Sequence, residues 1–543
     1  PEYDIVLNEN QRKVSESIKE TMDFKKKDKV NVHLIHGITG SGKTEVYMDL
    51  IDYTIKKGKS VIVLIPEIAL TYQTVMRFTR RFKEKVSIIN SRLSSGERYD
   101  QFERAKNGDV TIMIGPRSAL FTPFSNLGLI VIDEEHESAY KSESVPKYHA
   151  IEVAQKRAYD TGATVVLGSA TPSLESYYKA KNGTYILHKL TTREKGNLPS
   201  VSIVDLREEL QQGNKSIFSN KLQTLINDRL EKKEQTMLFI NRRGFAGFVS
   251  CRDCGKAIKC PHCDVSLTYH KDTHTMRCHY CDFQVPYQQK CSHCGSTNIK
   301  LIGSGTQKIE EYLQNNFINS RVIRYDVDST RKKQGHHQLL KQFENQEANI
   351  LIGTQMIAKG LDFENVTFVG VINADLSLNI PDFRANERTF QLLEQVSGRS
   401  GRGKKQGTVM IQTYNPDHFV LQCVKNHDYQ SFYQKEMEMR KLAKYPPYCY
   451  LISILVQGKK EDDVTFCSQQ IKEYLVKQLP KAIVLGPANC TIYKMNDIYR
   501  KRMTLKITNT THVYEVLHAM SDYYNKKGRK VNVICDFNPY TTI

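Results

Sequence analysis

Eight of the thirteen cysteines form four C-x2-C pairs, spaced C-x2-C-x5-C-x2-C-x14-C-x2-C-x9-C-x2-C. Eight thiolates suit two tetrahedral Zn²⁺ sites of four cysteines each, which are closed and therefore structural. Iron–sulfur clusters also take four cysteines, but the tight C-x2-C-x2-C runs typical of them are missing. Without a visible secretory signal, such pairs indicate metal binding rather than disulfides. The predicted zinc ligands are Cys251, Cys254, Cys260, Cys263, Cys278, Cys281, Cys291 and Cys294.

The residues that follow each pair indicate which pairs share a metal. The outer pairs, Cys251/Cys254 and Cys291/Cys294, each precede a glycine, and the inner pairs each precede an aspartate. This symmetry favours nested sharing, inner with inner and outer with outer, while interleaved sharing stays open. Histidines in this stretch could replace a thiolate, but the cysteine count requires none of them. We expect these side chains at the surface: His262, His274, His279 and His293.

A second group of residues has the spacing of a phosphate site. Residues 37–44 read G-x-x-x-x-G-K-T after an apolar run and at the start of a helical pattern, which is the context that this motif requires. Gly37, Gly40 and Gly42 let backbone N–H groups turn toward phosphate oxygens. Lys43 would reach the β- and γ-phosphates, and the Thr44 hydroxyl would bind Mg²⁺. The pattern predicts a nucleotide site.

Carboxylates end another apolar run, in "LGLIVIDEEHES". Side chains at the C-terminal end of a parallel strand face the crevice where α/β sheets bind ligands. Asp133 would hold Mg²⁺ through water, and Glu134 would orient and deprotonate the attacking water. Taken alone, the segment fits a solvated acidic loop. Its place at a strand end, ninety residues after Lys43, favours the catalytic interpretation.

Arginines on a glycine-rich turn form the third group. The segment "QLLEQVSGRSGRG" places Arg399 and Arg402 beside Gly398 and Gly401. Such a turn can approach a γ-phosphate closely, and a guanidinium there would stabilise the charge of the transition state as an arginine finger in cis. Read alone, the segment fits a basic surface turn equally well.

Parallel strands are needed to position these groups. Short β-rich runs alternate with helical patterns in the first part of the chain, which predicts a parallel sheet with crossover helices. The alternation begins again after a polar stretch at 191–200, which we interpret as a linker, and the cysteine block interrupts this second α/β unit. The expected strands are 32–36, 60–65, 110–114, 129–132 and 163–167, then 237–240, 322–325, 350–352, 366–372 and 408–412.

The pattern changes after about residue 415. Strands are expected at 450–456, 482–493, 498–507 and 530–537, with helices at 461–478 and 511–526. The order β-α-β-β-α-β predicts a ferredoxin-like α+β domain. The predicted domains are lobe 1 (1–190), lobe 2 (191–246 and 304–415), the cysteine-rich zinc-binding insertion in lobe 2 (247–303) and the C-terminal domain (416–543).

Composition limits the class of protein and its partners. The formal net charge of +19 indicates a polyanion such as nucleic acid, although a solvated basic surface gives the same total. Apolar runs such as 61–65 are too short to cross a bilayer, so we expect no membrane partner and a cytoplasmic location. The sequence begins with Pro1 rather than methionine, and we expect it to be a fragment of a longer protein.

Together the motifs resemble those of superfamily 2 DNA helicases. They follow one another in the helicase order as "HGITGSGKT", "LIPEIALTYQ", "IGPRSALF", "IDEEHESAYKSESVPKYHA", "GSATPSLES", "LFINRRGFA", "ILIGTQMIAKGLDF" and "EQVSGRSGRG". With the cysteine insertion, the sequence is similar to the PriA family of replication-restart helicases over nearly its whole length. The resemblance implies two RecA-like P-loop lobes and agrees with nested zinc sites.

The resemblance also implies roles for single residues. Gln11 would recognise adenine, and Gly360 and Asp362 would line the nucleotide cleft from the second lobe. Thr71 and Arg117 would contact the DNA backbone, a role that their side-chain chemistry permits.

Two further segments have roles implied by the resemblance. Residues 168–171, Gly-Ser-Ala-Thr, would couple hydrolysis to movement of the lobes. Tyr140, Tyr148 and His149 lie in an aromatic-rich loop and would stack on single-stranded bases, although a solvated loop with incidental tyrosines fits as well.

The implied function is an ATP-dependent 3′-to-5′ DNA helicase that remodels stalled or branched forks and initiates primosome assembly. Its cofactors would be ATP, Mg²⁺ and two Zn²⁺. Its partners would be forked, single- and double-stranded DNA, the single-strand binding protein and other primosome proteins. The family's N-terminal DNA-binding region does not precede the phosphate loop in this sequence. The alternative is a nucleotide-gated platform that loads replication proteins without significant unwinding. A double-strand translocase of the restriction-enzyme kind would lack the cysteine insertion.

Overall fold

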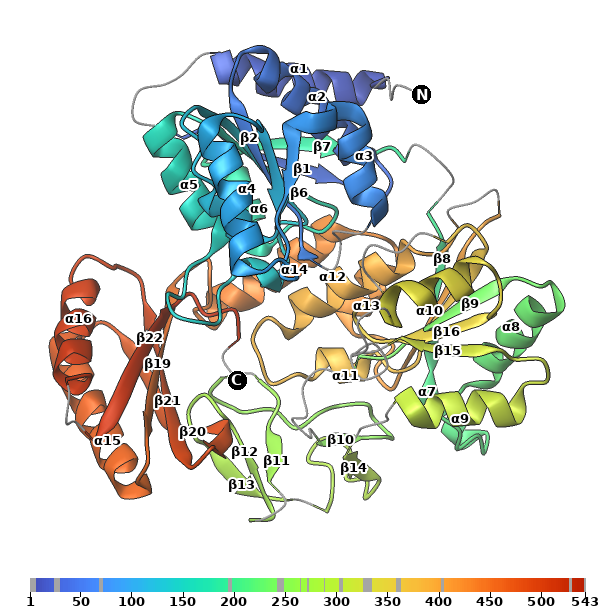
Figure 1. The fold of residues 1–543 in the computed structure, drawn as a ribbon. Coiled ribbons are helices and arrows are strands. Elements are labelled where there is room, and N and C mark those ends of the chain that lie inside the picture. Colours follow the sequence, from blue (N-terminus) through green and yellow to red (C-terminus); the bar gives the residue numbers. More distant parts are fainter. Residues whose placement is uncertain are drawn as a thin grey trace. The chain divides into compact units, whose positions relative to one another are not determined.

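The computed structural model divides into two compact units that meet in sequence between residues 197 and 198 (Figure 1). Each unit is described by itself. None of the helices in the described part of the chain has the length and apolarity needed to span a membrane. The structure describes residues 6–23, 30–67, 72–193, 198–241, 249–263, 265–270, 273–287, 289–301, 306–325, 335–357, 363–401, 405–526 and 530–541.

The first unit is built on a parallel sheet. Among the described residues it has seven strands in the order β3-β4-β2-β5-β6-β1-β7, and all neighbouring pairs are parallel. The strands are β1 (Val32–Gly37), β2 (Ser60–Leu64), β3 (Val86–Ile88), β4 (Ile112–Gly115), β5 (Leu127–Asp133), β6 (Thr164–Ser169) and β7 (Ile186–Leu190).

Helices cover both faces of this sheet, which explains why its central strands are apolar throughout. Figure 1 shows α2 and α3 on one side and α5 and α6 on the other. Ile35, Val63 and Val131 face the first side and share a core with Ile18 of α1 and Met48 of α2. The helices are α1 (Glu9–Asp23), α2 (Lys43–Lys56), α3 (Tyr72–Phe82), α4 (Ser95–Asn107), α5 (Ala150–Thr161) and α6 (Leu174–Lys181).

The second unit contains another parallel sheet, with the order β15-β16-β9-β17-β18-β8 in the described residues. Its strands are β8 (Ser200–Asp205), β9 (Gln235–Phe239), β15 (Val322–Tyr325), β16 (Ile350–Gly353), β17 (Val366–Val371) and β18 (Thr408–Thr413). Its helices are α7 (Leu206–Gln211), α8 (Asn220–Glu231), α9 (Thr306–Asn316), α10 (Gly335–Glu344), α11 (Asp375–Leu378), α12 (Ala385–Ser397), α13 (Phe419–Lys425) and α14 (Tyr429–Leu442).

The cysteine-rich segment is inserted between β9 and β15 and contains only short strands among its described residues. β10 (Val249–Cys251) pairs antiparallel with β14 (Ile299–Leu301). β11 (Thr268–His270), β12 (Thr275–Arg277) and β13 (Gln284–Pro286) form a second antiparallel sheet. Strands of three residues bury little apolar surface, so this segment depends on other contacts for its rigidity.

The C-terminal part folds as β-α-β-β-α-β with an antiparallel sheet in the order β20-β21-β19-β22. Both of its helices pack on one face of the sheet, where Ile454 and Leu505 meet Ile471 and Leu517. This is the ferredoxin-like arrangement predicted from the sequence. Its elements are β19 (Tyr450–Gly458), α15 (Glu461–Gln478), β20 (Ile483–Met495), β21 (Ile498–Ile507), α16 (Val513–Tyr524) and β22 (Val531–Phe537).

The predicted fold class is therefore confirmed: two α/β units with parallel sheets, a cysteine-rich insertion in the second, and an α+β domain at the end. The structure adds β3, β7 and β8, which the sequence reading did not include. The domain boundaries drawn from the sequence stay a prediction.

Candidate nucleotide site and metal centres

The phosphate loop joins the end of β1 to the start of α2. Gly40 and Gly42 have φ angles of 80° and 75°, in the left-handed region that favours glycine. Gly42 is the N-cap of α2, and no side chain among the described residues caps this helix end. The uncapped N-terminus of a fourteen-residue helix therefore faces the loop, which is the usual form of an anion site.

The Lys43 side chain folds back over this loop. Its Nζ donates to the carbonyl oxygen of Gly37 at 2.7 Å. A Cβ at Gly37 would lie 2.6 Å from Ser41 Oγ and 2.9 Å from Lys43 Cγ, so the loop closes around a position that only glycine fits. The structure thus places the predicted phosphate-binding residues Gly37, Gly40, Gly42, Lys43 and Thr44 in one strand–loop–helix turn.

Gln11 lies against the same loop. Its Nε2 donates to the Ser41 carbonyl at 3.0 Å, and its Oε1 accepts from the Asn8 N–H at 2.9 Å. The side chain is 1% exposed. Gln11 therefore ties α1 to the phosphate loop, and its contact with adenine stays a prediction.

Asp133 ends β5, at the edge of the sheet where its side chain was expected. Its Oδ1 accepts the hydroxyl of Tyr47 at 3.0 Å, and its carbonyl accepts the hydroxyl of Tyr140 at 2.6 Å. Burial raises the Asp133 pKa to about 6, helped by the Glu134 charge and opposed by Lys43 and by the Tyr47 hydrogen bond. The opposing effect of Lys43 links this carboxylate electrostatically to the phosphate loop.

Glu134 follows in a strained conformation. Its φ of 47° lies in the left-handed region, which a non-glycine residue seldom adopts outside functional sites. Its Oε2 is buried and has no hydrogen-bond partner among the described residues, with His136 Nδ1 at 3.6 Å. A buried carboxylate oxygen without a hydrogen-bond partner, beside the Asp133 carboxylate, is an oxygen donor set of the kind that Mg²⁺ and its waters prefer. The residues therefore fit a magnesium ion.

The third acidic residue joins the site to the next helix. Glu135 is buried, and its carboxylate accepts from the Ser173 N–H at 2.6 Å, from Ser173 Oγ at 3.0 Å and from Ser176 Oγ at 2.8 Å. These donors lie in the first turn of α6 and at its N-cap. Sequence reasoning gave Glu135 no role, and because the serines are 38 and 41 residues away in the chain, the local sequence gave no signal of these contacts.

His136 connects the acidic segment to residues 168–171. Its Nδ1 lies 2.7 Å from Ser169 Oγ, which in turn accepts the Thr171 N–H at 2.9 Å. A displacement of residues 168–171 would therefore act, through this hydrogen bond, on His136, which directly follows the acidic residues 133–135. That contact agrees with the coupling role proposed for residues 168–171, which itself stays a prediction.

Tyr140 does not have the role expected of it. The side chain is 1% exposed, and its hydroxyl donates to the carbonyls of Leu64 and Asp133. The prediction that it stacks on single-stranded bases was wrong, because the side chain is buried and its hydroxyl bonds to the main chain of β2 and β5. Nothing in the local sequence around this tyrosine, seven residues after Asp133, indicates that its side chain is buried.

The other residues of the predicted DNA surface have contacts within the protein. Arg117 donates to the carbonyls of Ala139 and Lys141, which fixes the start of the aromatic-rich loop. Tyr148 is half-buried with its ring edge-on to another aromatic, and His149 caps α5 through its Nδ1. Contacts of Arg117, Tyr148 and His149 with DNA stay predictions.

Several predicted site residues cannot be placed in the site. Arg399 is half-buried just after α12, in the second unit, and its approach to the phosphate loop of the first unit stays a prediction. Four others lie outside the described residues: Thr71, Gly360, Asp362 and Arg402.

The eight cysteines form two clusters of four. One contains the outer pairs and the other the inner pairs, and within each cluster all sulfur atoms lie within 4.8 Å of one another. The closest sulfurs are 3.6 Å apart in both clusters, from Cys251 to Cys294 and from Cys260 to Cys281. Four sulfurs about 2.3 Å from a shared Zn²⁺ would be about 3.8 Å apart, whereas a disulfide needs about 2.05 Å. The arrangement is nested and fits two zinc ions.

The histidines of the insertion lie outside these clusters, which among the described residues contain cysteine alone. His262, His274 and His293 are exposed, as expected. His279 is not: it is 4% exposed, and its Nδ1 donates to the Asn489 carbonyl at 3.0 Å. The surface prediction for His279 was wrong because this side chain packs on the C-terminal domain.

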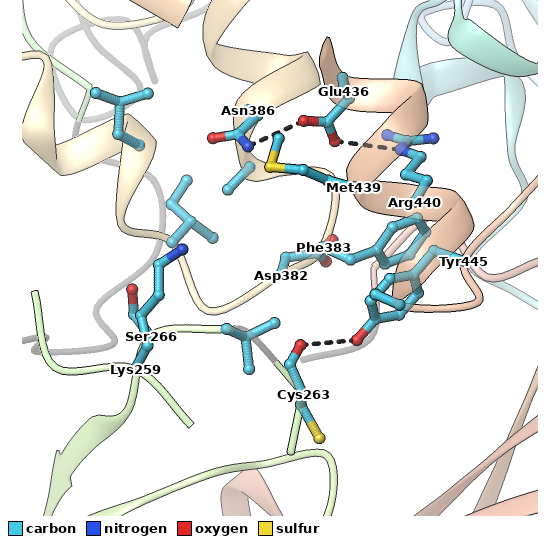
Figure 2. Close-up of a pocket in the computed structure, with 15 residues that line it drawn as sticks. Lys259, Cys263, Ser266, Asp382, Phe383, Asn386, Glu436, Met439, Arg440 and Tyr445 are labelled. Carbon is cyan, nitrogen blue, oxygen red and sulfur yellow. Dashed lines mark hydrogen bonds and ion pairs between the residues drawn. The ribbon is translucent and has the colours of Figure 1, made fainter. Parts of the chain in front are cut away.

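The insertion is anchored at a pocket that it shares with α12 and α14 (Figure 2). The Tyr445 hydroxyl donates to the Cys263 carbonyl at 3.1 Å, and its ring stacks on Phe383 at 4.6 Å. Across the pocket Glu436 accepts from Asn386 at 3.0 Å and from Arg440 at 3.2 Å. The loop that carries Cys263 is therefore held to the segment after α14 by a hydrogen bond, and the polar side chains across the pocket are paired with one another.

Models of known families match the chain in four segments. Residues 4–174 match "Type III restriction enzyme, res subunit" and residues 293–404 match "Helicase conserved C-terminal domain". Residues 260–286 match "PriA DNA helicase Cys-rich region (CRR) domain" and residues 441–540 match "Primosomal protein N C-terminal domain". The segments correspond to the first unit, the second sheet, the cysteine insertion and the C-terminal domain.

Curated relatives named "Replication restart protein PriA" match most of the chain. The protein of Bacillus subtilis is 47% identical over 98% of this chain and 66% of its own length. The Chlamydia pneumoniae protein is 42% identical over 95% of this chain and 70% of its own length. The Treponema pallidum protein is 38% identical over 94% of this chain and 77% of its own length. The chain spans about two thirds of the Bacillus protein and 58% of a Synechocystis relative.

Solved structures are more distant. A structure of RecG bound to a three-way DNA junction is 14% identical, with a TM-score of 0.48, over 81% of this chain and 47% of that chain. A likeness of this degree carries no argument about function.

Proposed function

Because the chain belongs to the PriA family of replication restart proteins, we propose that it is an ATP-dependent DNA helicase acting at stalled or branched replication forks. It would move 3′ to 5′ along DNA and initiate primosome assembly. The observation that supports this best is in the first unit, where Lys43, at the uncapped N-terminus of α2, acts electrostatically on Asp133, and Tyr47 of the same helix donates to the Asp133 carboxylate.

In this proposal each residue has a defined task. The backbone of residues 37–42 and Lys43 bind the β- and γ-phosphates, and Gln11 recognises adenine. Thr44 and Asp133 would hold Mg²⁺, which when bound neutralises charge on the phosphates. Glu134, with its unpartnered oxygen, orients a water molecule and takes its proton.

In this proposal, residues outside the phosphate loop and the acidic segment would complete the site. Arg399 and Arg402 would reach the γ-phosphate when the units close, and Gly360 and Asp362 would line the same cleft. Hydrolysis would then release the second unit. Cycles of closure and release on a bound strand are the means by which two lobes convert ATP into movement.

DNA would bind through phosphate contacts supported by the net charge of +19. Thr71 and Arg117 are the proposed backbone contacts, and Tyr148 and His149 the proposed stacking residues. The single-strand binding protein and other primosome proteins are the proposed protein partners, and a cytoplasmic location accords with that role. The two zinc sites, one joining the two ends of the insertion and one within it, would keep it rigid.

The alternative is an assembly platform that binds nucleotide and loads replication proteins without significant unwinding. Hydrogen bonds of the insertion with Phe383, just before α12, and with Tyr445 and Asn489 of the C-terminal domain support this reading, because they would hold the insertion in a fixed place for a partner. Strand displacement separates the two proposals, whereas ATPase activity stimulated by DNA does not.

The test is an unwinding assay on forks with either a 3′ or a 5′ single-stranded tail, with ATP and Mg²⁺. The helicase proposal expects strand displacement on the 3′-tailed fork and none with Lys43→Ala, which should still bind DNA. Turnover of ATP by Lys43→Ala would refute the phosphate-loop assignment. Full DNA-stimulated turnover without displacement on any fork would favour the platform.

A further inference from the structure

Tyr47 is a buried residue of α2 that the motifs do not assign. It follows Thr44 by one helical turn and is 1% exposed. Its hydroxyl donates to Oδ1 of Asp133 at 3.0 Å. The phenol of the phosphate-loop helix thus touches the carboxylate that would hold the metal.

The same hydroxyl lies where a side chain at position 168 of the neighbouring strand β6 would otherwise lie. Asp133 of β5 and Gly168 of β6 are register partners in the sheet. A Cβ at Gly168 would lie 1.6 Å from the Tyr47 hydroxyl oxygen. Glycine at position 168 therefore makes room for the phenol, and the hydroxyl sits over the Asp133–Gly168 pair.

Packing alone does not require this arrangement. A buried tyrosine hydroxyl needs a hydrogen-bond partner, and a main-chain carbonyl serves that need at Tyr140 of the same unit. Tyr47 instead bonds to a carboxylate side chain. A carboxylate that binds a metal through water must be held in one rotamer, and a donor on one oxygen leaves the other to face the ligand.

We propose that Tyr47 is a positioning residue that fixes the Asp133 carboxylate for metal binding and makes that carboxylate sensitive to the position of β6 at Gly168. The inference rests on the proposed nucleotide site. A shift of residues 168–171 would change the space left to the phenol, and the phenol would carry the shift to Asp133. Three elements, α2, β5 and β6, then meet at one hydroxyl.

The test measures metal binding directly. Mn²⁺ replaces Mg²⁺ as a probe, and its uptake by the protein with ADP is followed from the electron paramagnetic resonance signal of free Mn²⁺. Tyr47→Phe removes the hydroxyl and keeps the ring. We expect the Mn²⁺ concentration for half-saturation to rise about tenfold, which is the order of one hydrogen bond to a charged group. Binding of a fluorescent ADP analogue in EDTA should not change.

A matched control lies on the same helix. The Tyr53 hydroxyl also donates to a carboxylate, Asp23 Oδ2 at 2.6 Å, but this pair is at the surface. Tyr53→Phe should leave Mn²⁺ uptake and ATP turnover unchanged. Gly168→Ala places a methyl group against the Tyr47 hydroxyl from β6. The effect of Gly168→Ala on Mn²⁺ uptake should be smaller in a protein that also carries Tyr47→Phe than in the wild type.

The outcomes separate this inference from the function it rests on. If the wild-type protein takes up no Mn²⁺ with ADP, the proposed nucleotide site fails. If the wild type binds Mn²⁺ and Tyr47→Phe binds it equally well, the positioning role is overturned while the ATPase proposal stands. Additive effects of Tyr47→Phe and Gly168→Ala would overturn the coupling to β6.

Discussion

At the scale of single residues, the backbone and side chain of Glu134 support its proposed catalytic role. Its left-handed backbone and unpartnered buried oxygen both cost folding free energy, on the order of 1–3 kcal/mol each. A residue selected for stability alone would avoid both. The combination points to a group held ready for a water molecule.

We expect Glu134→Gln to lower the turnover number for ATP by about 10²- to 10⁴-fold, because an amide cannot take the proton from water. Nucleotide binding should persist, since the shape of the side chain is kept. Phosphate release and binding of a fluorescent nucleotide are the two measurements. Glu84→Gln, at an exposed position, serves as the control, and a Glu134→Gln protein with wild-type turnover would rule out the general-base role.

The sequence predicted the residues whose spacing is fixed by chemistry, namely Lys43 and Asp133 in their strand-end contexts. It did not predict Tyr47 or Glu135, because neither belongs to a spacing pattern and each acts through a buried partner. The burial of Tyr140 was not predicted for the same reason. Burial of a tyrosine depends on the elements packed around it, which the local sequence does not show.

At the scale of elements, the cysteine clusters reinforce the small apolar core that the insertion shares with the residues around Phe383 and Tyr445. Its strands are three residues long, yet Cys260, Cys278 and Met276 are almost fully buried. Sulfur atoms around two ions supply the cross-links that apolar side chains supply elsewhere.

Cys260→Ser should remove the inner zinc and leave the outer one, so the zinc content should fall from about two ions to about one per chain. The nested grouping predicts the same loss for Cys278→Ser and for the double variant of both. Metal analysis of the purified protein checks this. Cys467→Ser, in α15, is the control and should keep both ions. A drop to about one ion in each single variant but to none in the double variant would indicate that sharing is not nested.

The long, strongly apolar strands were predicted well, whereas the edge strands were not. β3 has three residues, and β7 alternates exposed and buried positions at the edge of its sheet, so neither has the apolar run of a central strand. β8 begins at Ser200, where the sequence reads as the end of a polar linker. The ferredoxin-like order was predictable because its strands and helices are long and follow each other without insertions.

At the scale of the whole molecule, we expect the net charge of +19 to favour the proposed association with DNA. A net charge of this size favours binding to any polyanion, and such binding releases counterions from the polyanion. Specific recognition would then depend on fewer contacts, such as those proposed for Arg117 and Tyr148.

We expect the affinity for a DNA fork to fall steeply with salt, by about 10³-fold or more between about 50 and 200 mM if six or more phosphates are contacted. Fluorescence anisotropy of a labelled fork at several KCl concentrations measures this slope. Lys43→Ala should show the same slope, because it alters the nucleotide site alone. An affinity that is constant over this range would contradict a phosphate-based mode of binding.

The hydrogen bonds from Tyr445 to Cys263 and from His279 to Asn489 join the metal-bearing loops to the last domain of the chain. Removal of the ions with a strong chelator should therefore destabilise the C-terminal domain as well as the insertion. Trypsin would then cut within residues 416–543 as well as within 247–303, while the first sheet keeps its resistance. Metal supply would in this way set the lifetime of a domain whose described residues contain no cysteine cluster of their own.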